Sequence, residues 1–179
     1  MRLIAVLALS LLIALPADAR SLNRSEQRGL EAALAAYSDA LAEGDAAALT
    51  EALPPRLLRF HAGLTGMEVP ALEAAMTQQT QAMMEKIRFG ALEADAAAAE
   101  ANLSKLADGT RVLWSILPAR FTMEQDGRTS RVDQPVLALR DDGEWYLLRV
   151  DPGQKRILAA VYPFLAEVDL PAMNVTPAE

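Results

Sequence analysis

The sequence predicts an α+β domain in which N-terminal helices pack on an antiparallel sheet and a short helix follows the strands. Apolar residues at helical spacing in the first half of the chain indicate the helices. The sheet is indicated by three pairs that separate apolar runs, namely Asp108-Gly109, Asp126-Gly127 and Asp142-Gly143. Asp and Gly tolerate the positive φ angles of tight turns, so these pairs are hard to reconcile with an all-helical fold.

The first residues have the features of an export signal. Arg2 precedes an apolar run from Leu3 to Leu15, and Ala17-Asp18-Ala19 is a small-x-small cleavage site. The run is shorter than the roughly 20 residues of a membrane span, so we expect no membrane span. We expect residues 1–19 to be removed as a signal peptide and residues 20–179 to form one domain that is periplasmic or secreted.

Composition narrows the classes of partner and site. The formal net charge of −7 argues against a nucleic-acid backbone or an anionic membrane surface as partner. The chain has no cysteine, which excludes disulfide bonds and thiolate sites. It also has no Gly-rich phosphate loop and no Gly-x-Ser-x-Gly nucleophile motif, and we expect no cofactor.

The first predicted helix spans residues 25–43. Its apolar stripe consists of Leu30, Leu34, Tyr37 and Leu41. Ser25 can cap the N-terminal end, and Gly44 lies where a C-terminal glycine belongs.

Two more helices are predicted before the strands. Asp45 can cap a short helix through Leu53, which Pro54-Pro55 must end. A third helix begins near Pro70, a favourable first-turn residue, and runs to about Ile87. The stretch between them, Arg56 to Val69, is predicted to be irregular and contains His61.

Residues 91–108 fit two predictions. Their alanine content and the spacing of Leu92, Ala96, Ala99, Leu103 and Leu106 favour a helix. Residues 89–95 also alternate as a strand does, and the strand that begins at Val112 needs a partner along its edge. The sequence leaves both alternatives open.

A register can be assigned to the central hairpin. A two-residue turn at Asp126-Gly127 places Phe121 opposite Val132 and Leu117 opposite Val136. One face of the pair is then mostly apolar, and the other carries polar pairs such as Arg120 with Asp133.

The registers of the two flanking hairpins follow from charge and turn type. A three-residue loop at residues 141–143 pairs Arg140 with Glu144 and sets Leu139 against Trp145, whereas a two-residue loop opposes Asp141 and Glu144. We therefore predict the three-residue loop, with Gly143 at positive φ. The Asp108-Gly109 turn sets Leu103 opposite Trp114.

A short helix is predicted after the last strand. Asp151 is an N-terminal cap followed by proline, so residues 153–161 are expected to be helical and to stop before Pro163. The tail from about Asn174 is expected to be flexible.

The order of these elements and the final strand Asp142-Gly143-Glu144-Trp145-Tyr146 resemble the NTF2-like superfamily. The resemblance covers residues 25–150. It implies a cone in which helices pack on the concave face of a curved antiparallel sheet and enclose a pocket. It also favours strand for part of residues 89–105, whereas residues 151–171 extend beyond the usual end of such domains.

His61 is the one histidine in the chain and the one weak catalytic candidate. The resemblance implies this role, since catalytic members of the superfamily use a histidine with an aspartate in the pocket as general base. A lone histidine is more often a surface or core group. It cannot form a zinc site by itself, and we expect no metal site. Glu93, Asp95 and Glu100 match no calcium-loop spacing and are read as a solvated face.

Four aromatic residues are candidates for lining an apolar pocket on the sheet: Trp114, Phe121, Trp145 and Tyr162. Core packing is the alternative role for them. We expect a non-catalytic binding module for a small apolar ligand or a protein partner. The alternatives are a lyase or isomerase that uses His61 as base, and an envelope assembly protein that forms a homodimer through its sheet.

Overall fold

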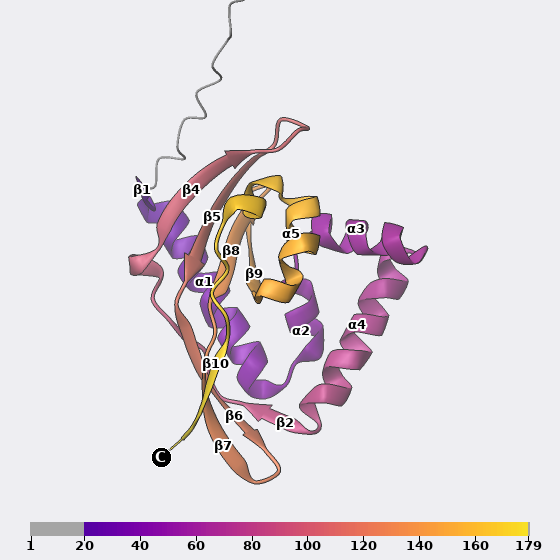
Figure 1. The fold of residues 1–179 in the computed structure, drawn as a ribbon, viewed down its shortest axis with the longest axis vertical. Coiled ribbons are helices and arrows are strands. Elements are labelled where there is room, and N and C mark those ends of the chain that lie inside the picture. The colour runs from indigo at the N-terminus through magenta and orange to yellow at the C-terminus, as the bar shows by residue number, and fades with distance from the viewer. Residues whose placement is uncertain (1–19, 179) are drawn as a thin grey trace, which may run out of the picture.

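A computed structural model describes residues 20–178 of the chain (Figure 1). The predicted signal peptide, residues 1–19, lies outside the described residues. Helices and antiparallel strands both occur, as the sequence predicts for an α+β fold. Within residues 20–178, no helix is both long enough and apolar enough to cross a membrane.

The first helix, α1 (Arg24–Glu43), is confirmed with a different cap. The cap is Asn23 and not Ser25, because Asn23 and Glu26 form a reciprocal capping box. Gly44 ends the helix at φ 75°, as predicted. Asp45 then caps α2 (Ala46–Glu51) by accepting hydrogen bonds from two backbone N–H groups, which confirms the second helix.

The prediction of an irregular stretch at residues 56–69 is wrong. Residues Pro55–Thr65 form helix α3, which Gly66 ends at φ 67°. Pro55 both stops α2 and begins α3, because proline is excluded from helix interiors but suits the first turn. Helix α4 follows at Val69–Met84, close to the predicted range.

The strands form two sheets. The first sheet has the order β1-β4-β5-β8-β9, and the second has the order β10-β7-β6-β2, with β3 also paired to β6. Their bounds are β1 Arg20–Ser21, β2 Ile87–Phe89, β3 Glu93–Ala94, β4 Glu100–Lys105, β5 Arg111–Leu117, β6 Ala119–Gln125, β7 Arg128–Asp133, β8 Val136–Asp141, β9 Glu144–Arg149 and β10 Asn174–Pro177. All pairings are antiparallel.

One long hairpin passes from the first sheet to the second. The predicted register is confirmed along it, with Phe121 opposite Val132 and Leu117 opposite Val136. Pro118 interrupts one arm and Pro135 the other, and between them the N–H of Gln134 donates to the carbonyl oxygen of Ala119 at 2.9 Å. The hairpin changes sheets where these prolines remove ladder donors.

Both flanking hairpins form, with registers that differ from those predicted. At the second, Asp142 (φ 52°) and Gly143 (φ 89°) form a two-residue turn, so Asp141 faces Glu144 and Leu139 faces Tyr146. The opposed carboxylates are tolerated because Asp141 is buried and hydrogen-bonded elsewhere, to Arg56 and Tyr162.

At the first flanking hairpin, Trp114 faces Asn102 and not Leu103. The loop has three residues because Leu106 and Thr110 close it by a backbone hydrogen bond of 2.8 Å. The carboxylate of Asp108 within this loop accepts the N–H of Thr110 at 2.9 Å.

Of the two alternatives for residues 91–108, helix and strand, the structure shows strand. Strands β3 and β4 lie in this range, with a 3-10 turn at Ala96–Ala98 between them. In the tail, which the sequence predicts to be flexible, β10 pairs with the edge of β7, and the N–H of Ala178 donates to the carbonyl oxygen of Thr129. An edge strand presents unpaired N–H and C=O groups, and β10 satisfies those of β7.

The central strands of the first sheet, β5 and β8, are buried on both faces. One face packs against α1 through residues such as Val136, Ala138 and Leu147. The other packs against α3, α5 (Lys155–Val161) and the 3-10 helix Pro163–Glu167, through Leu137, Leu139 and Leu148 among others. Helix α5 is preceded by a 3-10 turn at Pro152–Gln154, so the predicted C-terminal helix is confirmed in a shorter form.

Candidate ligand-binding cleft

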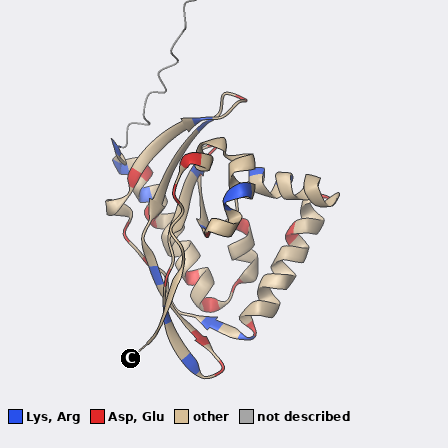
Figure 2. Cartoon of the chain, viewed as in Figure 1, with Lys and Arg blue, Asp and Glu red and all other residues tan. Residues whose placement is uncertain are grey.

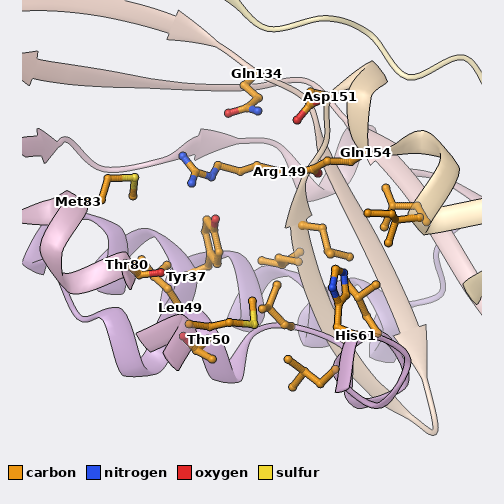
Figure 3. Close-up of a pocket in the computed structure, with 18 of the residues that line it drawn as sticks. Tyr37, Leu49, Thr50, His61, Thr80, Met83, Gln134, Arg149, Asp151 and Gln154 are labelled. Carbon is orange, nitrogen blue, oxygen red and sulfur yellow. The ribbon is translucent and has the colours of Figure 1, made fainter. Parts of the chain in front are cut away.

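A cleft of about 530 Å³ lies beside β9. Helices α1 to α4 and the β9 strand contribute to its wall, as do α5 and the segment that leads into β10 (Figure 3). The two hydrophobic clusters meet here, because Tyr37 and Leu147 belong to the cluster under α1, whereas Leu57 and Leu158 belong to the cluster under α5. The volume lies within the range of small-molecule sites, roughly 300–1,000 Å³.

Most of the lining is aliphatic. The apolar residues are Leu49, Leu53, Leu57, Leu58, Met76, Met83, Leu147, Leu148, Ile157, Leu158 and Met173. Leucine and methionine side chains of this kind form an adaptable apolar surface. The cleft therefore suits an apolar molecule better than a highly polar one.

Helix α4 forms one wall but is sparsely packed. Leu72 is its one buried residue. Met76 and Met83, which face the cleft, remain partly exposed. A ligand in the cleft would supply apolar contacts that α4 does not obtain from the rest of residues 20–178.

Three polar side chains from separate elements converge at one part of the cleft: Tyr37 of α1, Gln134 of the loop before β8, and Arg149 of β9 (Figure 3). The Tyr37 hydroxyl points towards the guanidinium of Arg149. Tyr37 and Gln134 are 8% exposed, and Arg149 is half-buried. The guanidinium carbon lies 5.7 Å from the centre of the Phe89 ring, a distance that allows a cation–π contact.

Arg149 forms no ion pair within the described residues. The other three cleft-lining residues that can carry charge or titrate are Tyr37, His61 and Asp151. Asp151 accepts the N–H of Gly153 at 2.7 Å as a helix cap. Burial raises the pKa of Tyr37 above its ordinary value, and the nearby Arg149 acts in the opposite direction.

His61 lies in the wall of the cleft, on α3, and is half-buried. Its ring packs edge-on against Phe60 at 6.3 Å between centroids. Among the hydrogen bonds of residues 20–178, none joins its imidazole to a carboxylate. A general base oriented by an acid, as in the enzyme alternative, therefore has no preformed partner in the described chain.

The four aromatic residues predicted to line a pocket lie outside the cleft and are divided between the two clusters. Trp114 stacks on Phe164 at 5.3 Å, and Tyr162 also contacts Phe164. Phe121 and Trp145 belong to the α1 side, where the Trp145 indole lies against Gly29 of α1.

A buried polar network holds the α3 and α5 walls to β8. Asp141 accepts hydrogen bonds from Arg56 Nε at 3.1 Å and from the Tyr162 hydroxyl at 3.2 Å. Burial and the Asp141 carboxylate both raise the pKa of Tyr162. Arg56 also donates to Asp108, and hydrogen bonds from Thr110 and Arg56 lower the pKa of Asp108 to about 2.

Charged side chains are spread over the helices and strands (Figure 2). Glu93 and Glu100 are exposed, and Asp95 caps the 3-10 turn. No group of three or more potential ligands within residues 20–178 is arranged to hold a metal ion. The large apolar side chains exposed in the described part of the chain are Leu64, Met67, Leu103, Ile157, Met173 and Val175, of which Ile157 and Met173 line the cleft.

Sequence reasoning missed Arg149, although a signal was present. Trp145, Leu147 and Arg149 alternate along β9, and the first two pack on the α1 side. A cation in register with inward-facing residues is directed towards the buried side of the strand, where a charge ordinarily needs a polar partner.

No protein-family model, curated protein or solved structure matches this chain.

Proposed function

We propose that this protein is an exported, non-catalytic module that binds a small apolar ligand in the cleft beside β9. One observation carries the proposal: a cleft of about 530 Å³ whose wall is mainly Leu, Met and Ile side chains. The predicted signal peptide supports a periplasmic or secreted location. A protein partner is the broader alternative within the same binding role.

The resemblance to the NTF2-like superfamily supports the same role. Such cones enclose a pocket between helices and a curved sheet. In this chain a long hairpin changes sheets at Pro118 and Pro135, and the cleft lies between helices α1 to α4 and β9. Membership of the superfamily is part of the proposal.

The position of His61 keeps a lyase or isomerase as the second candidate. His61 lines the cleft, so a substrate bound there would lie beside the imidazole. Asp151 lines the same cleft, although its carboxylate is engaged as a helix cap. The enzyme hypothesis requires a proton transfer by His61, and the binding hypothesis does not.

Filling the cleft tests the binding role. Thr80 of α4 lines the cleft, and Gln79 beside it is exposed and does not. We expect Thr80→Trp to abolish binding of a neutral apolar dye such as Nile red, because the indole occupies the space of the ligand. Gln79→Trp is the matched control and should bind as the wild type does.

Equal dye binding by both tryptophan variants would place the ligand elsewhere and refute the proposal. For the enzyme candidate, His61→Ala separates the two roles. The substitution should weaken ligand binding modestly, because it removes the imidazole contacts from the wall of the cleft. Catalytic turnover that disappears in a folded His61→Ala variant would replace the binding reading with the enzyme reading.

A further inference from the structure

The charge arrangement of the cleft bears on the kind of ligand it holds. Arg149 is the one Arg or Lys among the cleft-lining residues. An arginine keeps its charge at physiological pH and presents a planar fork of donors that matches a carboxylate. Its guanidinium lies over the Phe89 ring, and no carboxylate of residues 20–178 forms an ion pair with it.

Two further groups point to the same place. Residues Tyr37 and Gln134 are both more than nine-tenths buried, and the Tyr37 hydroxyl and the Gln134 amide face the cleft near Arg149 (Figure 3). No hydrogen bond joins the Gln134 side-chain amide to another described residue, the Tyr37 hydroxyl lies close to Arg149, and neither polar group is sealed away from the cleft. A hydroxyl, an amide and a guanidinium can each donate to one anionic oxygen pair.

We propose that the cleft binds an aliphatic monocarboxylate, with its carboxylate at Arg149, Tyr37 and Gln134 and its hydrocarbon chain along the Leu and Met wall. This inference rests on the proposed binding role. A single cation fits a single negative charge. Asp151 in the same cleft disfavours a dianionic phosphate, because like charges repel in a partly desolvated site.

The first test uses the wild-type exported chain and four probes that share one octyl chain: octanoate, octanol, octylamine and octyl phosphate. Calorimetric titration should give the tightest binding for octanoate. Extending the carboxylate from hexanoate to decanoate should strengthen binding about fourfold per methylene until the cleft is full.

The outcomes separate the two proposals. Octanol binding as tightly as octanoate overturns the carboxylate inference and leaves the apolar binding role intact. Tighter binding of octylamine overturns it in favour of recognition by Asp151, and tighter binding of octyl phosphate overturns it in favour of a phosphate. If none of the four probes binds, the carboxylate inference fails, and the Nile red comparison of Thr80→Trp with Gln79→Trp decides the binding role separately.

Variants test the head-group site. Arg149→Gln should weaken octanoate binding about tenfold or more and octanol binding much less, because the hydrogen bond lost to a carboxylate is charge-assisted and the one lost to a hydroxyl is not. Arg149→Lys should give an intermediate loss, since lysine lacks the planar fork. Arg131→Gln, at an exposed position on β7, is the matched control and should bind both probes as the wild type does.

Two variants guard against a folding artefact at Arg149. Tyr37→Phe should weaken octanoate binding about fivefold and octanol binding by a smaller factor, because the hydrogen bond to an anionic oxygen is the stronger one. Asp151→Asn can retain the helix cap and removes a negative charge, so octanoate should bind at least as tightly. Weaker octanoate binding in Asp151→Asn, or equal losses for both probes in Tyr37→Phe, would overturn the assignment.

Discussion

Removing the Arg56 guanidinium should destabilise the fold strongly. Arg56→Met keeps the aliphatic stem but leaves the Asp141 carboxylate, whose side chain is 6% exposed, with one hydrogen bond from Tyr162. Breaking a buried ion pair by removing one partner costs about 3–5 kcal/mol. The Arg56 side chain is 24% exposed, so water can replace part of the lost hydrogen bonding to Asp141. We therefore expect a loss at the lower end of this range, about 3 kcal/mol.

The second ion pair of Arg56 contributes little to this figure. Asp108 is exposed, and solvent screens ion pairs at such positions. With a urea m-value of about 2 kcal/mol/M, the midpoint of unfolding should fall by about 1.5 M. Tryptophan fluorescence measures it, since Trp114 is buried and Trp145 half-buried.

Two comparisons make this prediction refutable. Arg120→Met removes an exposed pair with Asp133 and should change stability by less than about 1 kcal/mol. Adding Asp141→Asn to Arg56→Met removes the stranded charge and should recover about 1–2 kcal/mol. A midpoint equal to that of Arg120→Met, or no recovery in the double variant, would show that Asp141 is not a buried charge held by Arg56.

Three further predictions concern the turn, the pH dependence and processing. Gly143→Val should lower the free energy of unfolding in urea by about 1–2 kcal/mol, because φ at this position is 89°. A Cβ there meets no atom within 4 Å, so the loss comes from the backbone alone. Gly63→Ala is the control: it lies inside α3 with no atom within 4 Å of the added Cβ, and it should not destabilise the fold. The pKa of Tyr162 is raised above 10, so the folded protein retains a proton that the unfolded chain releases. Stability should therefore fall as pH rises above 10, and the fall should be shallower in Tyr162→Phe; identical slopes would contradict the shift. Cleavage should follow Ala19, and an intact mass that includes residues 1–19 in the exported protein would contradict it.

Local signals made much of the fold predictable. The α1 stripe and the Asp126-Gly127 turn are determined by residues close in sequence, and both were predicted correctly. The register error at Asp142-Gly143 has a non-local cause. Sequence neighbours indicated repulsion between Asp141 and Glu144, whereas Arg56, from a distant helix, neutralises Asp141.

The cleft was less predictable because it depends on tertiary packing. The sequence predicts aromatic residues in the pocket because aromatics on a curved sheet under helices can line one, but large buried side chains such as Tyr162 fill the core. The cleft is lined by aliphatic residues from elements far apart in sequence, and one of them, α3, was not predicted as a helix. His61 was assigned to a loop, whereas α3 places it in the cleft wall.

The most direct test of the binding cleft is a nuclear magnetic resonance titration of methyl-labelled methionine with octanoate. Met76, Met83 and Met173 line the cleft, whereas Met67 and Met123 do not. The account predicts saturable shifts of the three cleft methyl signals and unchanged signals from Met67 and Met123. Saturable shifts confined to Met67 or Met123, or no shift of any methionine, would contradict it.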